Sequence, residues 1–460
     1  MSVTSKPSSE SFDDEPFRDL VRDALGSIPF SDEELAAFIA SLGKRHRNVV
    51  RLRNGADQPS LPFSVEPVPW YSLGYRCVSA ETRPSKLLAY AAADYYVQDA
   101  GSLLALATLK ADRKDALKNQ IVCDLCAAPG GKATAILESL GDEGFLLANE
   151  PIRSRVPALL HNLSRTGSDR FAISQLDPDD LAKQLAGCFD VVVVDAPCSG
   201  QALLSRKRQS VSALSPNQIE HSASRQERIL SAASRLLRPG GKLVYSTCTF
   251  AVAENESQID GLLDSEDFTA NPLDELQPYA SPITPACYRL WPHQHDCAGS
   301  FAASLRRSET ADSAKTFRTP KPVKTPVDLN QWFAESTGEH RYFASDSSLY
   351  AIPNDSPVWV ETVAKLGPEI AHRTGKVWKP AHAAALQRDT RLRCHQTMDV
   401  DHEVATQYLS GSPVPCPTRG WTVIEYQRRP LGWVKGDRGL GKNHLPTASR
   451  FAQLLPPTPH

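Results

Sequence analysis

Five short apolar runs, separated by stretches long enough for helices, dominate the middle of the chain. They read IVCDL (121–125), GFLLANE (144–150), FAISQLD (171–177), DVVVVDA (190–196) and GKLVYST (241–247). Continuous apolar strands that alternate with helical stretches are typical of a parallel sheet covered by helices on both faces. We therefore expect the α/β class, with a doubly wound (Rossmann-like) sheet. In such sheets ligands bind at the carboxyl ends of the strands, so the residues that close each run are candidate site residues.

The segments on either side predict further domains. Residues 16–42 carry apolar side chains at helical spacing, with Ser31 as the predicted N-cap and Glu34 as its capping-box partner. Residues 85–110 return to helical periodicity around YYVQDAGS, a segment that either continues the helix or breaks it. The Pro-, Lys- and Thr-rich stretch 308–330 predicts a linker. The predicted parts are a helical or mixed N-terminal domain (1–110), the α/β domain (111–307), the linker (308–330) and a small mixed β-rich C-terminal domain (331–460).

The composition predicts an ordinary globular protein, because 41% of the 460 residues are hydrophobic and 23% are charged. There is no run of eighteen apolar residues, and the first residues, MSVTSKPSSESFDDEPF, are polar and acidic. We therefore expect neither a membrane span nor a secretory signal. Ten cysteines without a compact framework predict free thiols in a reducing compartment. The expected location is the cytoplasm.

The formal net charge of −2 does not by itself indicate a nucleic-acid-binding protein, but basic residues are clustered. Residues 44–53, KRHRNVVRLR, contain five Lys or Arg and no acid, and residues 205–210 read SRKRQS. Such patches can neutralise phosphates. The alternative for each cluster is a solvated helix face.

A tight turn at Gly130-Gly131 follows the first run and opens a helix. Backbone N–H groups and a helix N-terminus at such a turn can approach an anionic or carboxylate-bearing ligand. The spacing is neither G-x-G-x-x-G nor a P-loop, which favours an adenosine cofactor other than a dinucleotide or ATP. Glu150 closes the second run and can accept hydrogen bonds from ribose hydroxyls, and Asp177 closes the third and can face the adenine. The alternatives are a purely structural turn and exposed loop acids.

Cys123 and Cys126 form a C-x-x-C pair within this turn region. Without a second pair of ligands nearby, the pair is a poor candidate for a zinc or redox site. We expect no metal in this protein.

Two cysteines, Cys198 and Cys248, follow the ends of two apolar runs. A thiolate that adds to C6 of a pyrimidine makes C5 nucleophilic enough to take a methyl group from a sulfonium donor. An acid at the ring nitrogen assists the addition, and a base later removes the C5 proton. Asp195 is the predicted acid, and the two cysteines would divide attack and release. The alternative for each cysteine taken alone is a small buried hydrophobic residue.

Three motifs in this order, DLCAAPGGK (124–132), DAPCSG (195–200) and YSTCTFAVAENE (245–256), resemble the signature motifs of the Sun-type (Fmu-like) RNA cytosine-5 methyltransferases. The resemblance extends to YYVQDAGS (95–102) and RLWPHQHDCAGSFAASLRR (289–307). From GKVWKP to KNHLP the C-terminal part is similar to the PUA-like module of the bacterial branch that acts on small-subunit rRNA. The sequence departs from the family at Gln201-Ala202, where Glu-Gly is usual, and at GSF (299–301), where a Phe pair is usual.

The resemblance implies an S-adenosyl-L-methionine-dependent methyltransferase domain. By that resemblance Cys248 is the nucleophile, Cys198 assists product release, Asp195 contacts the target cytosine and Lys132 belongs to the same catalytic group. Glu150 would hold the ribose and Asp177 the adenine. The other implied cofactor-binding residues are Cys126, Ala127, Ala128, Pro129, Gly130, Gly131, Lys132, Arg155 and Asp195, with Asn162 as a further candidate on the helix after Glu150.

The expected function is the formation of 5-methylcytosine in RNA, through a base flipped out of its stack. Small-subunit (16S) rRNA is the first expected substrate and tRNA the second, with the small ribosomal subunit as a candidate partner, no membrane partner, and a monomeric enzyme. The rival interpretations are DNA cytosine methylation and a non-catalytic RNA-binding assembly factor, which would need none of Cys198, Asp195 and Cys248.

In the C-terminal domain Trp421 and Trp433 can stack bases or fill a core, and Lys442 and His444 can contact phosphate or form a surface turn.

Overall fold

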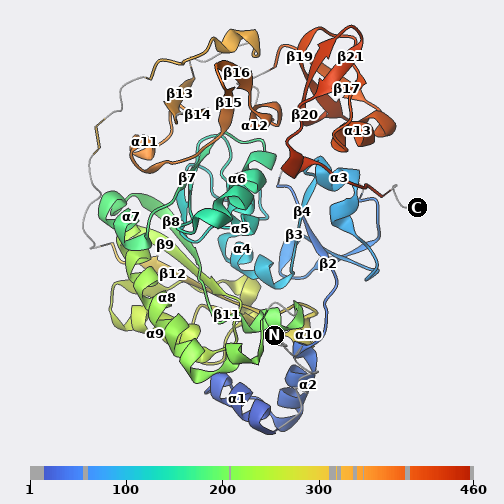
Figure 1. Ribbon diagram of the computed structural model, residues 1–460. Coiled ribbons are helices and arrows are strands. Elements are labelled where there is room, and N and C mark those ends of the chain that lie inside the picture. The colour runs from blue at the N-terminus through green and yellow to red at the C-terminus, as the bar shows by residue number, and fades with distance from the viewer. Residues whose placement is uncertain are drawn as a thin grey trace, which may run out of the picture.

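The computed structural model describes residues 15–54, 61–206, 209–309, 317–318, 323–334, 339–345, 347–388 and 394–455. Within these residues the strands form four sheets: a large central sheet, an N-terminal sheet beside it and two C-terminal sheets at one end (Figure 1). Part of the predicted linker (310–316 and 319–322) and two residues of the basic cluster SRKRQS (207–208) lie outside the described residues.

The central sheet has eight strands among the described residues, in the order β10-β12-β9-β8-β5-β6-β7, with β11 also paired to β12. Its strands are β5 (Ile121–Asp124), β6 (Phe145–Asn149), β7 (Phe171–Ser174), β8 (Phe189–Asp195), β9 (Leu237–Thr247), β10 (Phe268–Ala270), β11 (Cys287–Leu290) and β12 (Ser300–Arg307). The strands β5 to β9 pair in parallel, and β12 is antiparallel to β9. Every predicted apolar run is a strand of this sheet, so the expected α/β class is confirmed.

Helices cover both faces of the central sheet. They are α4 (Leu104–Leu109), α5 (Gly131–Ser139), α6 (Val156–Arg165), α7 (Pro178–Leu185), α8 (Pro216–Leu236) and α9 (Glu256–Asp264). The short helix α10 (Pro292–His295) instead packs against α2 (Asp32–Leu42) of the N-terminal part. Side chains alternate along a strand, so Val191 and Val193 pack in the core beneath α4, α5 and α6, while Val192 and Val194 pack with α7, α8 and α9. Because both faces of β8 are buried, its sequence is continuously apolar rather than alternating.

The strand order reverses between the neighbouring strands β5 and β8. From β5 the chain continues through β6 to β7 at one edge of the sheet, and from β8 it continues through β9 toward the other edge. At such a switch point the connections leave in opposite directions and a crevice opens at the carboxyl ends. Asp124 ends β5 and Asp195 ends β8. The fold therefore brings these two acids to the mouth of one crevice.

Within the described residues the N-terminal part has three α-helices and a small sheet of order β2-β3-β1-β4. Its elements are α1 (Glu15–Leu25), α2 (Asp32–Leu42), β1 (Val49–Leu52), β2 (Val65–Val68), β3 (Tyr71–Cys77), α3 (Leu88–Ala91) and β4 (Tyr95–Gln98). The capping box predicted at α2 is confirmed, with the Ser31 side chain accepting from Glu34 N and the Glu34 carboxylate accepting from Ser31 N. Of the two alternatives for 85–110, the break in the helix is the correct one, because YYVQ forms β4, which pairs with β1.

The basic stretch 44–53 is not a solvated helix face, so that alternative is wrong. Its second half is strand β1, in which Arg51 is 1% exposed and pairs with Glu138 at 2.6 Å. Arg53 donates to the Thr166 carbonyl at 2.5 Å, beyond the last turn of α6, and Arg47 pairs with Asp296 at 2.9 Å. These arginines join elements of the protein to one another.

The C-terminal part contains two sheets. The first, β13-β14-β15-β16, consists of β13 (His340–Ala344), β14 (Ser348–Pro353), β15 (Glu369–Thr374) and β16 (Val377–Pro380), with helices α11 (Val360–Val363) and α12 (His382–Ala385). The second, β17-β19-β20-β21-β18, consists of β17 (Thr397–Val400), β18 (Val414–Pro415), β19 (Gly420–Tyr426), β20 (Arg429–Asp437) and β21 (Leu440–Asn443), with helix α13 (His402–Leu409). A small β-rich C-terminal domain is confirmed.

The first C-terminal sheet docks on the outer edge of the central sheet at β7 (Figure 1). Leu366 bridges Ile173 of β7, and the Trp359 ring lies 5.2 Å from the Phe189 ring. His340 Nε2 lies 2.8 Å from Asp169 Oδ2 in a fully buried contact. This C-terminal sheet is therefore part of the same packed core as the central domain.

All ten cysteines fall within the described residues, and all are free thiols. Among the helices that the structure describes, none has both the length and the apolar character needed to cross a bilayer.

Candidate active site

A pocket of ≈ 620 Å³ opens at the carboxyl ends of the central strands. It is lined by nearly all of the residues singled out from the sequence: Cys126, Ala127, Ala128, Pro129, Gly131, Lys132, Glu150, Arg155, Asp195, Cys198 and Cys248. Gly130 lies in the same loop, beside the lining residues. One cavity thus brings together side chains that are more than a hundred positions apart in the chain.

The glycine turn forms one wall of this pocket. Gly130 adopts φ 111°, and a Cβ on Gly131 would lie 3.2 Å from Gln98 Oε1 and 3.3 Å from the Tyr96 ring. A side chain on Gly131 would therefore displace the ends of the Gln98 and Tyr96 side chains. Arg155 Nη2 donates to the Ala128 carbonyl at 2.5 Å and Asn162 Nδ2 to the Pro129 carbonyl at 2.8 Å. These two candidates therefore shape the loop itself.

Glu150 lies just past the end of β6 and is 1% exposed. Its Oε1 accepts from the backbone N–H of Ile152 at 3.0 Å, and its Oε2 lies 3.1 Å from Arg155 Nη1. The preceding residue, Asn149, was not identified from the sequence. Its amide donates to the Leu125 and Leu176 carbonyls, which ties the end of β6 to both neighbouring loops.

Asp177 does not lie among the described residues that line the pocket. It caps helix α7 by accepting from Asp179 N at 3.0 Å, and its carboxylate pairs with Arg228 at 2.9 Å. The structure thus separates it from the other acids predicted to bind the cofactor. The capping pattern before Pro178 was the sequence signal for this role.

Asp124, at the end of β5, is a pocket residue that sequence reasoning missed. Its side chain is 1% exposed, and neither carboxylate oxygen has a hydrogen-bond partner among the described residues. Burial, together with the nearby Asp195 charge, raises the pKa of Asp124 to about 7, while Lys132 opposes the shift. The signal was present, since this acid closes the first apolar run just as Asp195 closes the fourth.

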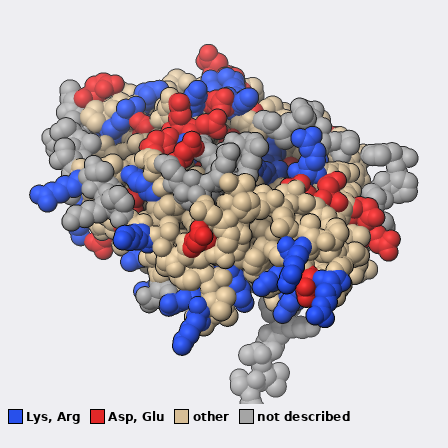
Figure 2. Space-filling model, turned by 90° about the horizontal axis from the view of Figure 1, so that it is seen from above, with Lys and Arg blue, Asp and Glu red and all other residues tan. Residues whose placement is uncertain are grey.

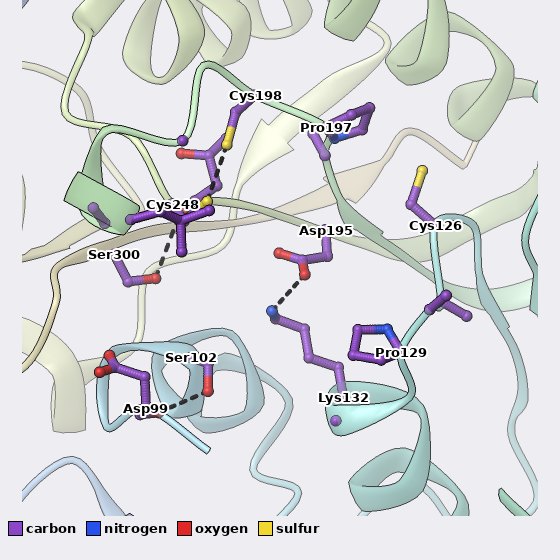
Figure 3. A pocket seen from close by; sticks show the side chains of 18 of the residues that line it. Asp99, Ser102, Cys126, Pro129, Lys132, Asp195, Pro197, Cys198, Cys248 and Ser300 are labelled. Atoms are coloured by element: carbon purple, nitrogen blue, oxygen red, sulfur yellow. Dashed lines mark hydrogen bonds and ion pairs between the residues drawn. The ribbon is translucent and has the colours of Figure 1, made fainter. Parts of the chain in front are cut away.

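The two cysteine thiols meet at one end of the pocket, with Cys198 Sγ 3.2 Å from Cys248 Sγ (Figure 3). Cys198 lies in the loop after β8, and Cys248 follows the last residue of β9. The hydrogen bond with Cys248, followed by burial, raises the pKa of the Cys198 thiol well above its usual range. Cys198 is therefore a protonated thiol at neutral pH.

Asp195 and Lys132 point toward each other across the pocket (Figure 3), with Lys132 Nζ 2.8 Å from Asp195 Oδ2. The other carboxylate oxygen accepts from Ser246 Oγ at 2.8 Å. The pair lies between the glycine loop and the cysteines. This acid is thus oriented by two partners beside the reactive thiols.

Strand β4 and the turn that follows it complete the pocket with Tyr96, Val97, Gln98, Asp99 and Ser102, all from the motif YYVQDAGS. Sequence reasoning quoted that motif without assigning a role to any residue in it. Asp99 Oδ1 accepts from Gly101 N at 2.9 Å and from Ala298 N at 3.2 Å, which ties this segment to the loop before β12.

Gln201, one of the departures from the family pattern, is fully buried. It lies between the loop that carries Cys198 and the loop that carries Cys248, which we call the two cysteine loops. Its Oε1 accepts from Phe250 N at 2.9 Å, and its Nε2 donates to the Ala213 carbonyl at 3.1 Å. Gly299, in the second departure, lines the pocket. In the part of the chain that the structure describes, no group of three or more His, Cys, Asp or Glu residues could hold a metal ion.

Known protein families match two parts of the chain. The profile described as 16S rRNA methyltransferase RsmB/F matches residues 114–306, and the profile described as methyltransferase RsmF PUA domain matches residues 395–451. Ribosomal RNA small subunit methyltransferase F of Erwinia tasmaniensis is 31% identical over 409 residues, which cover 84% of this chain and 84% of that protein. The protein of the same name from Serratia proteamaculans is 28% identical over 407 residues, with the same coverage.

Among solved structures, NSun6 from Pyrococcus horikoshii with SFG shares the fold at a TM-score of 0.54 and 19% sequence identity. The match covers 64% of this chain and 98% of that chain. SFG is an analogue of S-adenosylmethionine.

Proposed function

Because this chain belongs to the 16S rRNA methyltransferase RsmB/F family, we propose that it forms 5-methylcytosine in small-subunit (16S) rRNA through a covalent bond between Cys248 and C6 of the target base. The observation that carries this proposal is the pair of thiols 3.2 Å apart, beside an oriented acid, in the pocket that also holds the glycine loop. A protein that only bound RNA would need none of these groups. The substrate assignment comes from the relatives, which are named for small-subunit rRNA.

The family's cofactor is S-adenosyl-L-methionine, and the pocket residues fit it. Gly131 leaves a cradle that a Cβ would fill, and the buried carboxylate of Asp124 has no hydrogen-bond partner among the described residues. Both Glu150 and Asp124 line the pocket, and we assign Glu150 to the ribose hydroxyls and Asp124 to a cationic group. When bound, the cofactor supplies the methyl group on a sulfonium centre. Asp177, which lies outside the pocket, remains only a proposed adenine contact.

In the proposed first step the Cys248 thiol loses its proton and its sulfur forms a bond to C6, while the C5–C6 electron pair shifts toward N3, which takes up a proton. We assign Asp195, with Lys132 beside it, to N3, where a proton or a positive charge stabilises the shifted electrons. C5 thereby becomes the nucleophilic carbon that takes the methyl group.

In the second step a base removes the C5 proton, the C5–C6 double bond returns and the bond from sulfur to C6 breaks. The main cause of the high pKa of Cys198 is its hydrogen bond with Cys248. We assign Cys198 to this step. As the bond from sulfur to C6 breaks, Cys198 gives its thiol proton to the departing Cys248 sulfur, 3.2 Å away, and takes the C5 proton in its place, so both cysteines end the cycle as thiols.

The test compares wild type with Cys248→Ala and Cys198→Ala, using tritiated S-adenosylmethionine with small subunits, naked 16S rRNA and tRNA. We expect label at cytosine C5 in a small-subunit substrate, no label with Cys248→Ala, and a covalent RNA adduct with Cys198→Ala. Cys188→Ala is the matched control, because this partly buried cysteine lies outside the pocket lining and should retain activity.

Labelling of tRNA alone would move the substrate to tRNA. Tight RNA binding by the wild type without label in any of the three substrates would favour a non-catalytic assembly factor.

A further inference from the structure

The residues that follow the two cysteines are joined to one buried carboxylate, that of Glu254 in the 3₁₀ turn Val252–Glu254. Ser199 donates from Oγ to Glu254 Oε1 at 2.5 Å and from its backbone N–H to Oε2 at 2.9 Å. Thr249 Oγ1 donates to the same Oε1 at 3.2 Å. Since Ser199 follows Cys198 and Thr249 follows Cys248, a single carboxylate fastens both cysteine loops.

Glu254 is itself held from two further directions. Gln226 of α8 donates from Nε2 to Glu254 Oε2 at 2.9 Å and to the Pro197 carbonyl at 3.1 Å. The Tyr245 hydroxyl donates to the backbone carbonyl of Glu254 at 2.6 Å. Glu254, Ser199 and Gln226 have no exposed surface. A close-packed interior leaves such a group little room to move.

The chemistry of the contact suits a carboxylate and not an amide. Four hydrogen-bond donors converge on the two carboxylate oxygens of Glu254. A glutamine would replace one of these accepting oxygens with an NH₂ group, which is itself a donor. Burial raises the pKa of Glu254, and the hydrogen bonds from Ser199, Gln226 and Thr249 oppose the shift by favouring the charged form. Removing the carboxylate would leave several buried donors unpaired, which is costly.

Glu254 is not among the described residues that line the pocket, so it touches neither substrate nor cofactor directly. We propose that Glu254 is a positioning residue that sets the distance between the Cys198 and Cys248 thiols, so that both reach the two adjacent ring carbons of one base. The catalytic consequence rests on the proposed function. The effect on the distance between the thiols does not.

The test uses the full chain with Glu254→Ala, Glu254→Gln and Ser199→Ala. Its first readout is the rate at which diamide oxidises Cys198 and Cys248 to a disulfide, in which the two thiols give their hydrogens to the azo bond of diamide. Alkylation and peptide mass spectrometry identify the linked pair. We expect Glu254→Ala to slow this reaction at least roughly tenfold and to lower kcat about 10²-fold, because a displacement of about 1 Å has effects of that size.

Two further expectations distinguish positioning from general damage. The KM for S-adenosylmethionine should stay at the wild-type value, since Glu254 lies outside the pocket lining. Ser199→Ala keeps the backbone N–H bond to Glu254 and should show a smaller effect in the same direction. Glu254→Gln should fall between wild type and Glu254→Ala. If Glu254→Ala does not fold, Ser199→Ala and Glu254→Gln decide the proposal.

The matched control is Glu138→Gln, the same substitution at another buried acid, which pairs with Arg51 and contacts neither cysteine loop. It should lose thermal stability but retain the wild-type rate of disulfide formation. The proposal is overturned if folded Glu254→Ala and Ser199→Ala oxidise as fast as wild type, or if Glu138→Gln slows equally. If oxidation depends on Glu254 but the wild type methylates no RNA, the positioning role stands and the proposed function fails.

Discussion

At the scale of single residues, the site depends on groups whose protonation is set by their neighbours. The Cys198 thiol is kept protonated by the Cys248 thiol beside it, and Asp195 is oriented by Lys132 and Ser246. Each of these effects requires two side chains from different elements or loops of the fold to approach within hydrogen-bond distance. The reactivity therefore belongs to pairs of residues.

Asp124 allows a prediction about stability and pH. Folding raises the pKa of Asp124 from 3.8 to about 7, because the folded protein favours the protonated carboxyl. The contribution of this carboxyl to folding stability is therefore fully present below about pH 4 and is lost as the pH rises through 7. Each unit of pKa corresponds to about 1.36 kcal/mol, which sets an upper limit of about 4 kcal/mol. We therefore expect Asp124→Asn, without cofactor, to unfold at nearly the wild-type temperature at pH 4 and at a higher temperature at pH 8.

The measurement is thermal unfolding of both proteins across this pH range. A difference between them that stays constant from pH 4 to pH 8 would contradict the prediction. The comparison at pH 4 is the internal control, because both side chains are then neutral.

At the scale of elements, strand β1 and helix α5 are joined by a buried ion pair. Arg51 and Glu138 are nearly inaccessible, and Arg51 Nη2 also donates to Thr134 Oγ1 at 3.0 Å. Removing one partner leaves a buried charge unpaired, which typically costs about 3–5 kcal/mol, whereas replacing both with apolar side chains of similar volume is often neutral. The pair therefore affects how the N-terminal sheet sits against the helix that follows the glycine loop.

We accordingly expect Arg51→Met to lower the free energy of unfolding by about 3–5 kcal/mol, and Arg51→Met with Glu138→Leu to recover most of the loss. Urea denaturation of the single and double variants measures both values. Equal destabilisation by the single and double variants would show that the ion pair is not the cause.

At the scale of the whole molecule, the two C-terminal sheets bring basic and aromatic side chains together. Lys435 of β20 lies 5.7 Å from the Trp421 ring, and the His444 ring lies 4.4 Å from it. Burial and the nearby lysines 442, 379 and 435 lower the pKa of His444 to about 4, so this imidazole is neutral at neutral pH. The view onto the C-terminal sheets (Figure 2) shows Lys and Arg interspersed with acids and uncharged residues. We therefore expect RNA to contact only a limited part of this face.

This surface supports a prediction about RNA binding. We expect Lys435→Ala with Lys442→Ala to weaken binding of 16S rRNA and to reduce the slope of log affinity against log salt by about 1 for each lysine. At saturating RNA, kcat should not change, because neither lysine is among the residues that line the pocket. Binding measured at several salt concentrations provides the slope.

Lys183→Ala is the control, since this exposed lysine on α7 pairs with Asp180. An unchanged salt slope in the double variant would place the RNA on another surface. Trp433 is a poor target for such a test, because it is buried and donates to the Ala381 carbonyl.

We also propose, at this scale, the division of the chain at 110/111, 307/308 and 330/331, and a monomeric enzyme. The family matches at 114–306 and 395–451 fall inside two of the proposed segments. Light scattering of the purified chain checks the monomer, and a dimer would contradict it.

Much of the central fold was predictable because it depends on local patterns. A strand buried on both faces must be continuously apolar, so the five runs identified β5 to β9. The capping box at Ser31 and Glu34 was predictable for the same reason, since its two hydrogen bonds lie within four residues. The motifs at the strand ends predicted many of the pocket residues, because the carboxyl ends of parallel strands lie at one edge of a sheet.

What the sequence by itself determined is therefore the strand and helix pattern, the family and the candidate residues at the strand ends. Only the tertiary structure decided that the basic stretch 44–53 is partly buried, that Asp177 pairs with Arg228 outside the pocket lining, and that the Glu254 carboxylate joins the loops that carry Cys198 and Cys248. The physical reason is distance along the chain. A hydrogen bond or ion pair between residues 50 to 250 positions apart produces no recognisable pattern in the sequence. Burial of a strand or capping of a helix, in contrast, depends on residues that are neighbours in the sequence.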